Sequence, residues 1–397
     1  MPVELQINTR ESDTGTAIRT IRFFNEVKLS MKYDSVASTF SFVMYYDPAN
    51  KEHAEIAGVS HYHEAIIKYA HTEGEKELLL TGYILSQLFK SSSKKEPLAI
   101  GGYSKAGLLE DCDVPPELYP LESNGLTFRQ IVNKVISKFG GKKGIKFIVE
   151  NNRSTRGISD SAFKTETERV DASIPKSTAP ESRNIKAYLT ELATQKNIIL
   201  SHNPEGNLVV STANTDGTPI LDIDADSSPS VGFVGMTLNY NGQAIHSHIT
   251  VVRQADDEGG NSAKHTIANP LCPIVYRPKV VQLTSGDDIS ITEAATHEVS
   301  KELKNINLTI ELDRAVINGK FIRPNNTISV KNRDIYLYNK TRWFIESVEY
   351  TQSAQKESVI LTCVLPWVYN YYATNPNGKK SGPYNIFIDP HKNLPRV

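Results

Sequence analysis

The sequence predicts a mainly β fold with a mixed α and β middle, in which two similar antiparallel β-domains flank a small α/β domain. Residues 342–365 have the pattern of a complete β-hairpin, and residues 81–104, which lie 261 positions earlier, have the same pattern. Between these two stretches, the spacing of apolar residues changes from the alternation typical of strands to the three-to-four spacing typical of helices. The internal similarity and this change of period together predict the three-part organisation.

The two similar stretches align without a gap. Ile84 falls on Ile345, and Ser86 falls on Ser347. The remaining matched pairs are Ser92 with Ser353, Lys95 with Lys356, Glu96 with Glu357, Tyr83 with Phe344, and Phe89 with Tyr350. Each copy is a β-prone run, a polar turn that contains serine and lysine, and a second run in which alternate positions are apolar. Because the predicted strands and turn coincide as well as the residues, we interpret the chain as containing two copies of one β-domain.

Composition narrows the possible classes of protein. The 397 residues are enough for two or three domains. The 44 Lys and Arg nearly balance the 45 Asp and Glu, so the formal net charge of -1 gives the whole chain no positive field that would attract nucleic acid or an anionic membrane. Cys112, Cys272 and Cys363 are widely spaced and form no CxxC motif, which fits a reducing compartment and no metal cage. The sequence shows no secretory signal and no run of about 18 apolar residues, so we expect no membrane insertion.

The first β-domain is assigned to residues 1–114. Phe40 and Phe42 lie at strand period on one face, and turn residues separate short strands, a pattern that indicates a closed or sandwiched antiparallel sheet. The strands expected before the first copy of the hairpin cover residues 20–33, 39–48 and 64–70. Prolines at 115 and 116 end the domain.

The middle domain is assigned to residues 115–230. An apolar stripe at helical spacing predicts a helix over 126–139, which Gly140 and Gly141 end. Residues 151–182 are polar and predicted to be a mobile loop or an extended arm. The other expected elements are a strand over 145–149, a helix over 185–196, a hairpin over 197–212 and a polar loop over 213–230.

The second β-domain is assigned to residues 231–366. It is expected to contain a loop insertion over 255–291, rich in Asp, Gly and Pro, and the tight-turn pair Asn318-Gly319. The strands and helix expected here are 236–240, 246–253, a short helix over 292–304, the alternating run 308–312 and the strand 327–330, which leads to the second copy of the hairpin.

Residues 367–397 form an aromatic and proline-rich tail without a clear period, which we expect to be extended. Four aromatic residues in the tail are candidates for binding a partner, because aromatic side chains are enriched at interfaces. They are Trp367, Tyr369, Tyr371 and Tyr372.

None of the other candidate motifs predicts a catalytic, cofactor or metal site. His61 with His63, and His246 with His248, lack a third metal ligand at a diagnostic spacing. Residues 222–226 lack the glycine and glutamate of a calcium loop, and residues 140–144 end a helix where a phosphate loop would begin one. Glu166 and Glu168 could be a glycosidase pair only if the fold placed them across a cleft. We therefore expect a non-enzymatic protein.

The order of elements over residues 20–366 resembles that of the baseplate hub proteins of contractile-tailed phages, in particular the Mu-like tail hub and late-control tail proteins. The stretches that carry this resemblance are TGYILSQLFK, LAIGGYSKAGLLEDCDV, LTFRQIVNKVISKFG with IKFIVE, IKAYLTELATQKNIILSHNPEGNLVVSTA and WFIESVEYTQSAQKESVILTCVLP. The loop 151–182, the insertion 255–291 and the residues after Pro366 depart from the pattern of that family.

The resemblance implies two similar β-barrel domains per chain and a homotrimeric ring of pseudo-sixfold symmetry. Such a ring joins the hexameric tail tube to the trimeric central spike and lets DNA pass through its lumen without specific binding. It also implies contacts with the tape measure and other baseplate proteins, and assembly into the virion tail baseplate in the cytoplasm of a bacterial host. The alternative is a β-rich cell-wall hydrolase or carbohydrate-binding module of a tail.

Overall fold

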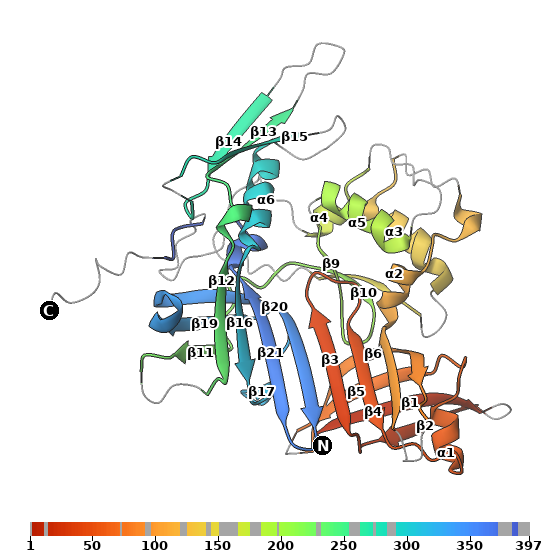
Figure 1. Cartoon of the computed structure of the whole chain (residues 1–397). Helices are drawn as coiled ribbons and strands as arrows, with labels where there is room; N and C mark the ends of the chain where they lie inside the picture. Colours follow the sequence, from red (N-terminus) through yellow and green to blue (C-terminus); the bar gives the residue numbers. More distant parts are fainter. Residues whose placement is uncertain are drawn as a thin grey trace. The chain divides into compact units, whose positions relative to one another are not determined.

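The computed structural model of the chain contains mostly antiparallel sheets with a few helices (Figure 1). It describes residues 2–11, 15–71, 74–91, 97–119, 125–139, 144–150, 166–174, 184–196, 198–227, 232–253, 263–272, 275–283, 291–371 and 383–387. No helix among these residues is both long and apolar enough to cross a membrane.

The chain divides into two compact units, each made of separate segments. Unit 1 comprises Met1–Thr212, Arg314–Ile322 and Val348–Val359. Unit 2 comprises Ala213–Asp313, Arg323–Ser347 and Ile360–Val397. The predicted domain boundaries after residues 114, 230 and 366 stay a prediction.

The β part of unit 1 follows the alternation of its sequence. In β3 and β4 every second residue is buried, and Val27 lies opposite Phe42 while Leu29 lies opposite Phe40 in the antiparallel ladder. The elements are β1 Val3–Glu11, β2 Gly15–Ile21, β3 Glu26–Lys32, β4 Thr39–Met44, α1 Lys51–Ile56, β5 Glu64–Ala70, β6 Lys76–Leu88, β7 Leu98–Ser104 and α2 Leu108–Asp111. Two short strands, β17 Val316–Ile317 and β18 Lys320–Phe321, also belong to this unit and form the predicted turn at Asn318-Gly319.

Two expectations for this sheet were incomplete. The first strands begin at residue 3, well before residue 20, and the single run expected over 20–33 is divided between β2 and β3. The edge strand β2 leaves Ile18 exposed, so it has less of the half-buried alternation that marks a strand in the sequence.

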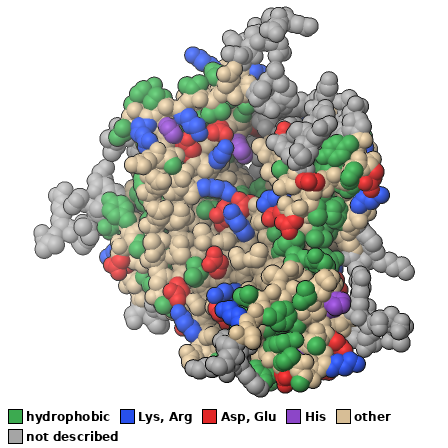
Figure 2. Space-filling view, turned by 45° about the vertical axis from the view of Figure 1, so that its right-hand side comes forward, with side chains coloured by type: hydrophobic (Ala, Val, Ile, Leu, Met, Phe, Trp, Pro, Cys, Tyr) green, Lys and Arg blue, Asp and Glu red, His purple; other side chains and the backbone are tan. Residues whose placement is uncertain are grey.

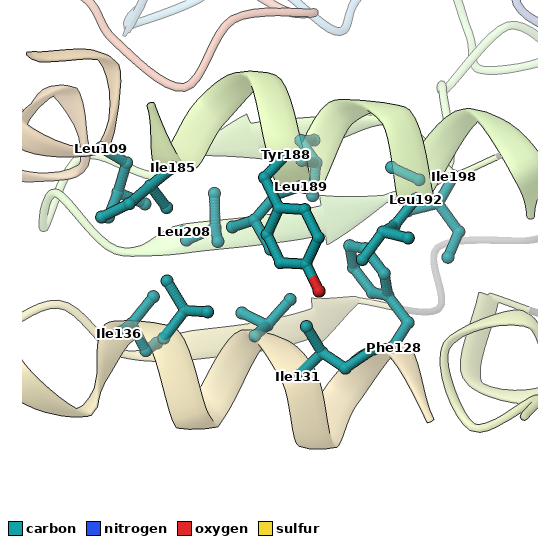
Figure 3. Packing of buried hydrophobic residues seen from close by; sticks show 14 of the residues in the cluster. Leu109, Phe128, Ile131, Ile136, Ile185, Tyr188, Leu189, Leu192, Ile198 and Leu208 are labelled. Carbon is teal, nitrogen blue, oxygen red and sulfur yellow. The ribbon is translucent and has the colours of Figure 1, made fainter. Parts of the chain in front are cut away.

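The α/β part of unit 1 has the helices predicted from apolar spacing. Helix α3, Phe128–Ile136, begins with a capping box in which Thr127 and Gln130 bond each other's backbone N–H groups, and Asn184 caps α5, Ile185–Gln195. The apolar faces of α3 and α5 face each other around Tyr188 (Figure 3). The strands are β8 Phe147–Glu150, which is parallel to β10 Leu208–Ser211, and β9 Leu200–His202, which is antiparallel to β10.

The predicted loop 151–182 is wrong in part. Helix α4, Glu166–Val170, lies inside it and buries Val170 in the same core as α3 and α5. This helix is only five residues long, too short to show a helical period in the sequence. Residues 151–165 and 175–182 lie outside the described part of the chain.

In unit 2 the sheet order is β12-β16-β21-β20, with β19 pairing both β20 and β11. The elements are β11 Leu221–Asp224, β12 Gly235–Tyr240, β13 His248–Arg253, β14 Ala263–Ala268, β15 Pro278–Leu283, α6 Ile291–Leu303, β16 Ile306–Leu312, β19 Thr327–Asn332, β20 Leu337–Ser353 and β21 Glu357–Val364. The hairpin end of β20 and β21, Val348–Val359, is counted with unit 1. Closure of the strands of either unit into a barrel stays a prediction.

Two predicted loops of unit 2 contain strands. The insertion 255–291 holds β14 and β15, which pair with the two edges of β13, and α6 covers one face of this small sheet with Ala294 and Ala295 (Figure 1). The polar loop 213–230 holds β11, which pairs in parallel with β19. These strands expose much of their side-chain surface, or alternate apolar residues with aspartates, so their sequences are typical of loops.

Candidate assembly surfaces

Five strands occur twice with the same connectivity. We call β3, β4, β5, β6 and β7 repeat A, and β12, β16, β19, β20 and β21 repeat B. In both sets the first strand lies beside the second, the second beside the fifth, the fifth beside the fourth, and the fourth beside the third. Five strands can be ordered in many ways, so a shared order is independent support for the internal repeat inferred from the sequence.

The ungapped alignment extends through both hairpins. Strand β6 begins at Lys76 and β20 at Leu337, again 261 positions apart, and the same offset relates the 3₁₀ turns Lys105–Gly107 and Pro366–Val368. Three aligned pairs of apolar residues in the two hairpins are buried in both copies. These pairs are Ile84 with Ile345, Leu98 with Val359, and Ile100 with Leu361. The repeat is therefore visible in sequence, strand order and burial.

The end of the second hairpin is buried in unit 1. The ring of Tyr350, which is fully buried, lies 5.3 Å from the ring of Phe321, and Phe321 lies 5.3 Å from Tyr69. Burial and the nearby carboxylate of Glu357 raise the pKa of Tyr69 to about 12, and raise that of Tyr350 as well. The backbone N–H of Phe321 donates to Glu77 at 2.9 Å. We call Tyr69, Phe321, Tyr350 and Glu357 the hairpin clamp.

The end of the first hairpin is exposed, in contrast. Phe89 aligns with Tyr350, yet 43% of its surface is exposed, and 54% of Leu88 is exposed. The ring of Tyr46 lies 5.4 Å from that of Phe89, and the side chain of Gln87 donates to the carbonyl of Gly58. This exposed apolar end of β6 is a candidate contact surface.

The tail residues predicted to bind a partner lie partly inside the chain. Trp367 is 4% exposed, and its ring lies 4.8 Å from that of Tyr384. The hydroxyl of Tyr369 donates to Glu346 at 2.6 Å, and Lys304 lies over its ring. Tyr371 is half-buried, and Tyr372 lies outside the described residues. Partner binding by these four residues stays a prediction.

His202 connects the α/β part of unit 1 to the loop after β3. Its Nδ1 lies 2.8 Å from the carbonyl of Ser35, and its Nε2 lies 2.6 Å from the hydroxyl of Ser38. A carbonyl only accepts, so Nδ1 carries the proton and Nε2 accepts from Ser38. Burial lowers the pKa of His202 below its ordinary value of 6.5, which favours this neutral form. No local motif marks His202, so its role could not be predicted from the sequence.

The remaining histidine and carboxylate candidates have structural partners. His61 and His63 stack with ring centroids 5.2 Å apart, and His63 Nε2 lies 2.9 Å from the carbonyl of Glu55. His246 pairs with Glu302 at 2.8 Å. Among the described residues, no three His, Cys, Asp or Glu side chains gather as a metal site would require.

The carboxylates considered as calcium ligands or glycosidase residues also make local contacts. Asp222 pairs with Lys340, and Asp224 and Asp226 both pair with Lys331. Glu166 is buried in α4 and accepts from Thr212 at 3.2 Å, whereas Glu168 is exposed. Figure 2 shows acidic and basic side chains interspersed over the face it presents, with no gathering of one sign.

Solved structures with a similar fold include proteins of phage tails. A 43 kDa tail protein of prophage MuSo2 from Shewanella oneidensis has a TM-score of 0.68 and 15% identity, over 92% of this chain and 99% of that one. A tail protein from Neisseria meningitidis has a TM-score of 0.69 and 17% identity, over 93% and 98% of the two chains. The chain has the fold of these tail proteins.

A more distant likeness reaches secretion machinery. A component of the type VI secretion system of Escherichia coli, described as similar in structure to tail proteins of bacteriophage T4, has a TM-score of 0.52 and 10% identity, over 97% of this chain and 80% of that one. No protein-family model and no curated protein matches the sequence.

Proposed function

We propose that this chain is the structural hub of a contractile-tail baseplate. In this proposal three copies form a ring that joins the hexameric tail tube to the trimeric central spike. The observation that carries it is the five-strand order that occurs in both repeat A and repeat B. Two repeats per chain give six repeats in a trimer. A threefold ring can therefore match a sixfold tube on one face and a threefold spike on the other.

The two repeats would each close into a barrel in the ring, and the lumen would pass DNA. Closure of a sheet into a barrel removes its free edges. Each barrel then presents only the strand edges and faces that contact its neighbours in the ring. A formal net charge of -1 suits a lumen that must not retain DNA. The proposed partners are the tail tube protein and the central spike protein, together with the tape measure and other baseplate proteins. The proposed location is the virion tail baseplate, assembled in the cytoplasm of a bacterial host.

The likeness to tail proteins over more than nine-tenths of the chain supports this proposal against a cell-wall hydrolase. Incubation of the purified chain with purified peptidoglycan should release no sugar or peptide fragments. Release above the level of a heat-denatured sample would favour the hydrolase.

The ring itself can be tested by electron microscopy of the purified chain, alone and with its spike protein. The proposal predicts top views with six lobes around a central hole. Top views with four lobes, as two chains would give, would contradict it.

A further inference from the structure

We propose that unit 2 carries a docking site for an extended aromatic segment of a partner protein, which residues 383–387 of the chain itself close as a releasable strap. The site consists of Trp367, Tyr240 and Tyr336, which we call the aromatic site, and we call residues 383–387 the tail strap. All of these residues belong to unit 2. The inference concerns unit 2 alone and does not depend on the ring proposed above.

Both ends of the tail strap pack on the aromatic site through ring contacts. The ring of Tyr384 lies 4.8 Å from that of Trp367 and meets it nearly edge-on. The ring of Phe387 lies 5.5 Å from that of Tyr240 and 6.4 Å from that of Tyr336. An aromatic side chain at each end therefore anchors the strap.

The tail strap is buried by its side chains, but its backbone is not part of a sheet. Ile386 is 4% exposed and Pro383 is buried. The backbone N–H of Phe387 donates to the side chain of Asn385 at 2.9 Å, inside the strap itself. Among the described residues, no backbone–backbone hydrogen bond joins the strap to a strand. A segment without such bonds opens locally at a lower free energy than a strand does, so the strap can leave while the sheet stays intact.

The aromatic site is fixed by the fold and is only partly covered by the strap. Tyr240 ends β12, and its hydroxyl donates to the carbonyl of Leu271 at 2.9 Å. Tyr336 has a φ of 68°, in the left-handed region that a bulky residue rarely adopts, and such strain is typical of functional sites. Tyr240 and Tyr336 are still 43% and 46% exposed beside the strap, so aromatic surface remains for a longer segment to cover.

The tail strap defines the chemistry of the partner segment. Its side chains are, in order, proline, aromatic, polar, aliphatic and aromatic. The proline favours an extended backbone, and the apolar side chains supply the anchors that recognition of an extended segment requires. We expect the partner to present the same order of side chains. Because the strap is tethered to its own site, its effective concentration there is on the order of millimolar, and the partner must displace it.

Tryptophan fluorescence of the full chain tests release of the strap. The chain has two tryptophans, Trp343, which is fully buried, and Trp367 beneath the strap. The variant Ile386→Asp places a charge in the buried part of the strap, so we expect it to shift the emission to the red and to increase quenching by acrylamide. The matched control Asn385→Asp changes an exposed neighbour and keeps an acceptor for the N–H of Phe387, so its quenching should equal that of the wild type. An unchanged circular dichroism spectrum verifies that the variant folds.

A synthetic peptide of residues 381–390, SGPYNIFIDP, tests whether the site accepts a separate segment. Added to the Ile386→Asp variant, the peptide should reverse the increased quenching with saturation, and a peptide with the same Ile386→Asp change should not. The wild-type chain should bind the peptide at least about tenfold more weakly, because its own strap occupies the site.

Three fluorescence results would overturn the inference. Quenching of a folded Ile386→Asp variant equal to that of the wild type would mean that the strap does not close the site. A released variant that the peptide fails to protect would mean that the site does not bind a separate segment. A mixture of variant and wild-type chains that is quenched less than the mean of the two would identify a second copy as the occupant in place of a partner protein.

Hydrogen exchange of the wild-type chain decides the matter if Ile386→Asp does not fold. The amides of residues 384–387 should exchange much faster than those of β21, because local opening releases the strap without unfolding the sheet. Equal protection would make these residues a fixed part of unit 2 and would overturn the inference. None of these outcomes changes the mass or the symmetry expected of the ring.

Discussion

At the scale of single residues, the buried side chain of His202 leads to a prediction about pH. The folded-state pKa of His202 is lowered by burial, so the neutral form is favoured in the folded chain. Its contribution to stability is complete above the unfolded pKa of about 6.5 and is lost as the pH falls below it. We predict that the urea midpoint of the wild type falls more between pH 7 and pH 5 than that of His202→Gln. Parallel pH profiles for the two proteins would contradict this assignment.

His202 also holds two backbone segments together, whatever its titration. The variant His202→Ala removes the hydrogen bonds to Ser35 and Ser38, and we expect it to lower the free energy of unfolding by about 1 kcal/mol at pH 8. Urea unfolding followed by far-UV circular dichroism measures this change, because both tryptophans lie in unit 2 and His202 lies in unit 1. Ser38→Ala serves as a control that removes only one of the two bonds, so it should cost less.

Gly102 shows how closely the two strands of the first hairpin approach. A Cβ on Gly102 would lie 1.9 Å from the carbonyl oxygen of Tyr83, a backbone atom that cannot turn away. We predict that Gly102→Ala lowers the free energy of unfolding by about 1–3 kcal/mol, the usual cost of forcing an extra group into a packed site. The control Gly235→Ala meets no atom within 4 Å and should be nearly neutral.

At the scale of elements, the hairpin clamp explains why three distant segments form one unit. Phe321 lies between Tyr69 of β5 and Tyr350 of β20 and is itself almost fully buried. We predict that Phe321→Ala destabilises unit 1 by about 3–5 kcal/mol, as expected for a large buried ring. Hydrogen exchange should then show faster exchange in β5 and in residues 348–359, with α6 unchanged. Equal loss of protection in α6 would contradict the division into two units.

The elements that could be predicted from the sequence are those with one strongly buried face. Helices α3 and α5 were found because their apolar stripes fill the core around Tyr188, and the two hairpins because Ile84, Leu98 and their aligned partners alternate inward. Strands β11, β14 and β15 were missed because they are short, polar or exposed. The pairing of such strands depends on neighbours that are distant in the sequence, and no local pattern reports them.

The site was predictable to a smaller extent than the fold. The alignment of Phe89 with Tyr350 is visible in the sequence, but the difference in burial that makes one a clamp residue and the other a candidate contact depends on the packing of Tyr350 against Phe321, which is distant from the first hairpin in the sequence. The same holds for the tail, where Trp367 packs on Tyr384 of its own chain. Aromatic composition alone does not distinguish a side chain that binds a partner from one that fixes the tail.

At the scale of the whole molecule, the balanced charge leads to a prediction about DNA. A protein that neutralises few phosphates gains little from the release of counterions, so the chain should bind duplex DNA weakly at physiological salt. Fluorescence anisotropy with a labelled duplex should show no saturable binding at micromolar concentrations of protein. Tight binding that weakens steeply with added salt would indicate a basic surface incompatible with a passive lumen.

The central claim is that two repeats per chain assemble into a ring of three chains. The most direct measurement is the solution mass of the purified chain by light scattering at several concentrations, first alone and then with the spike protein present. A ring of three chains has a mass of three times 44.1 kDa, which we expect in at least the second condition. A stable dimer in both conditions would contradict it, because two chains carry four repeats and cannot match a sixfold tube.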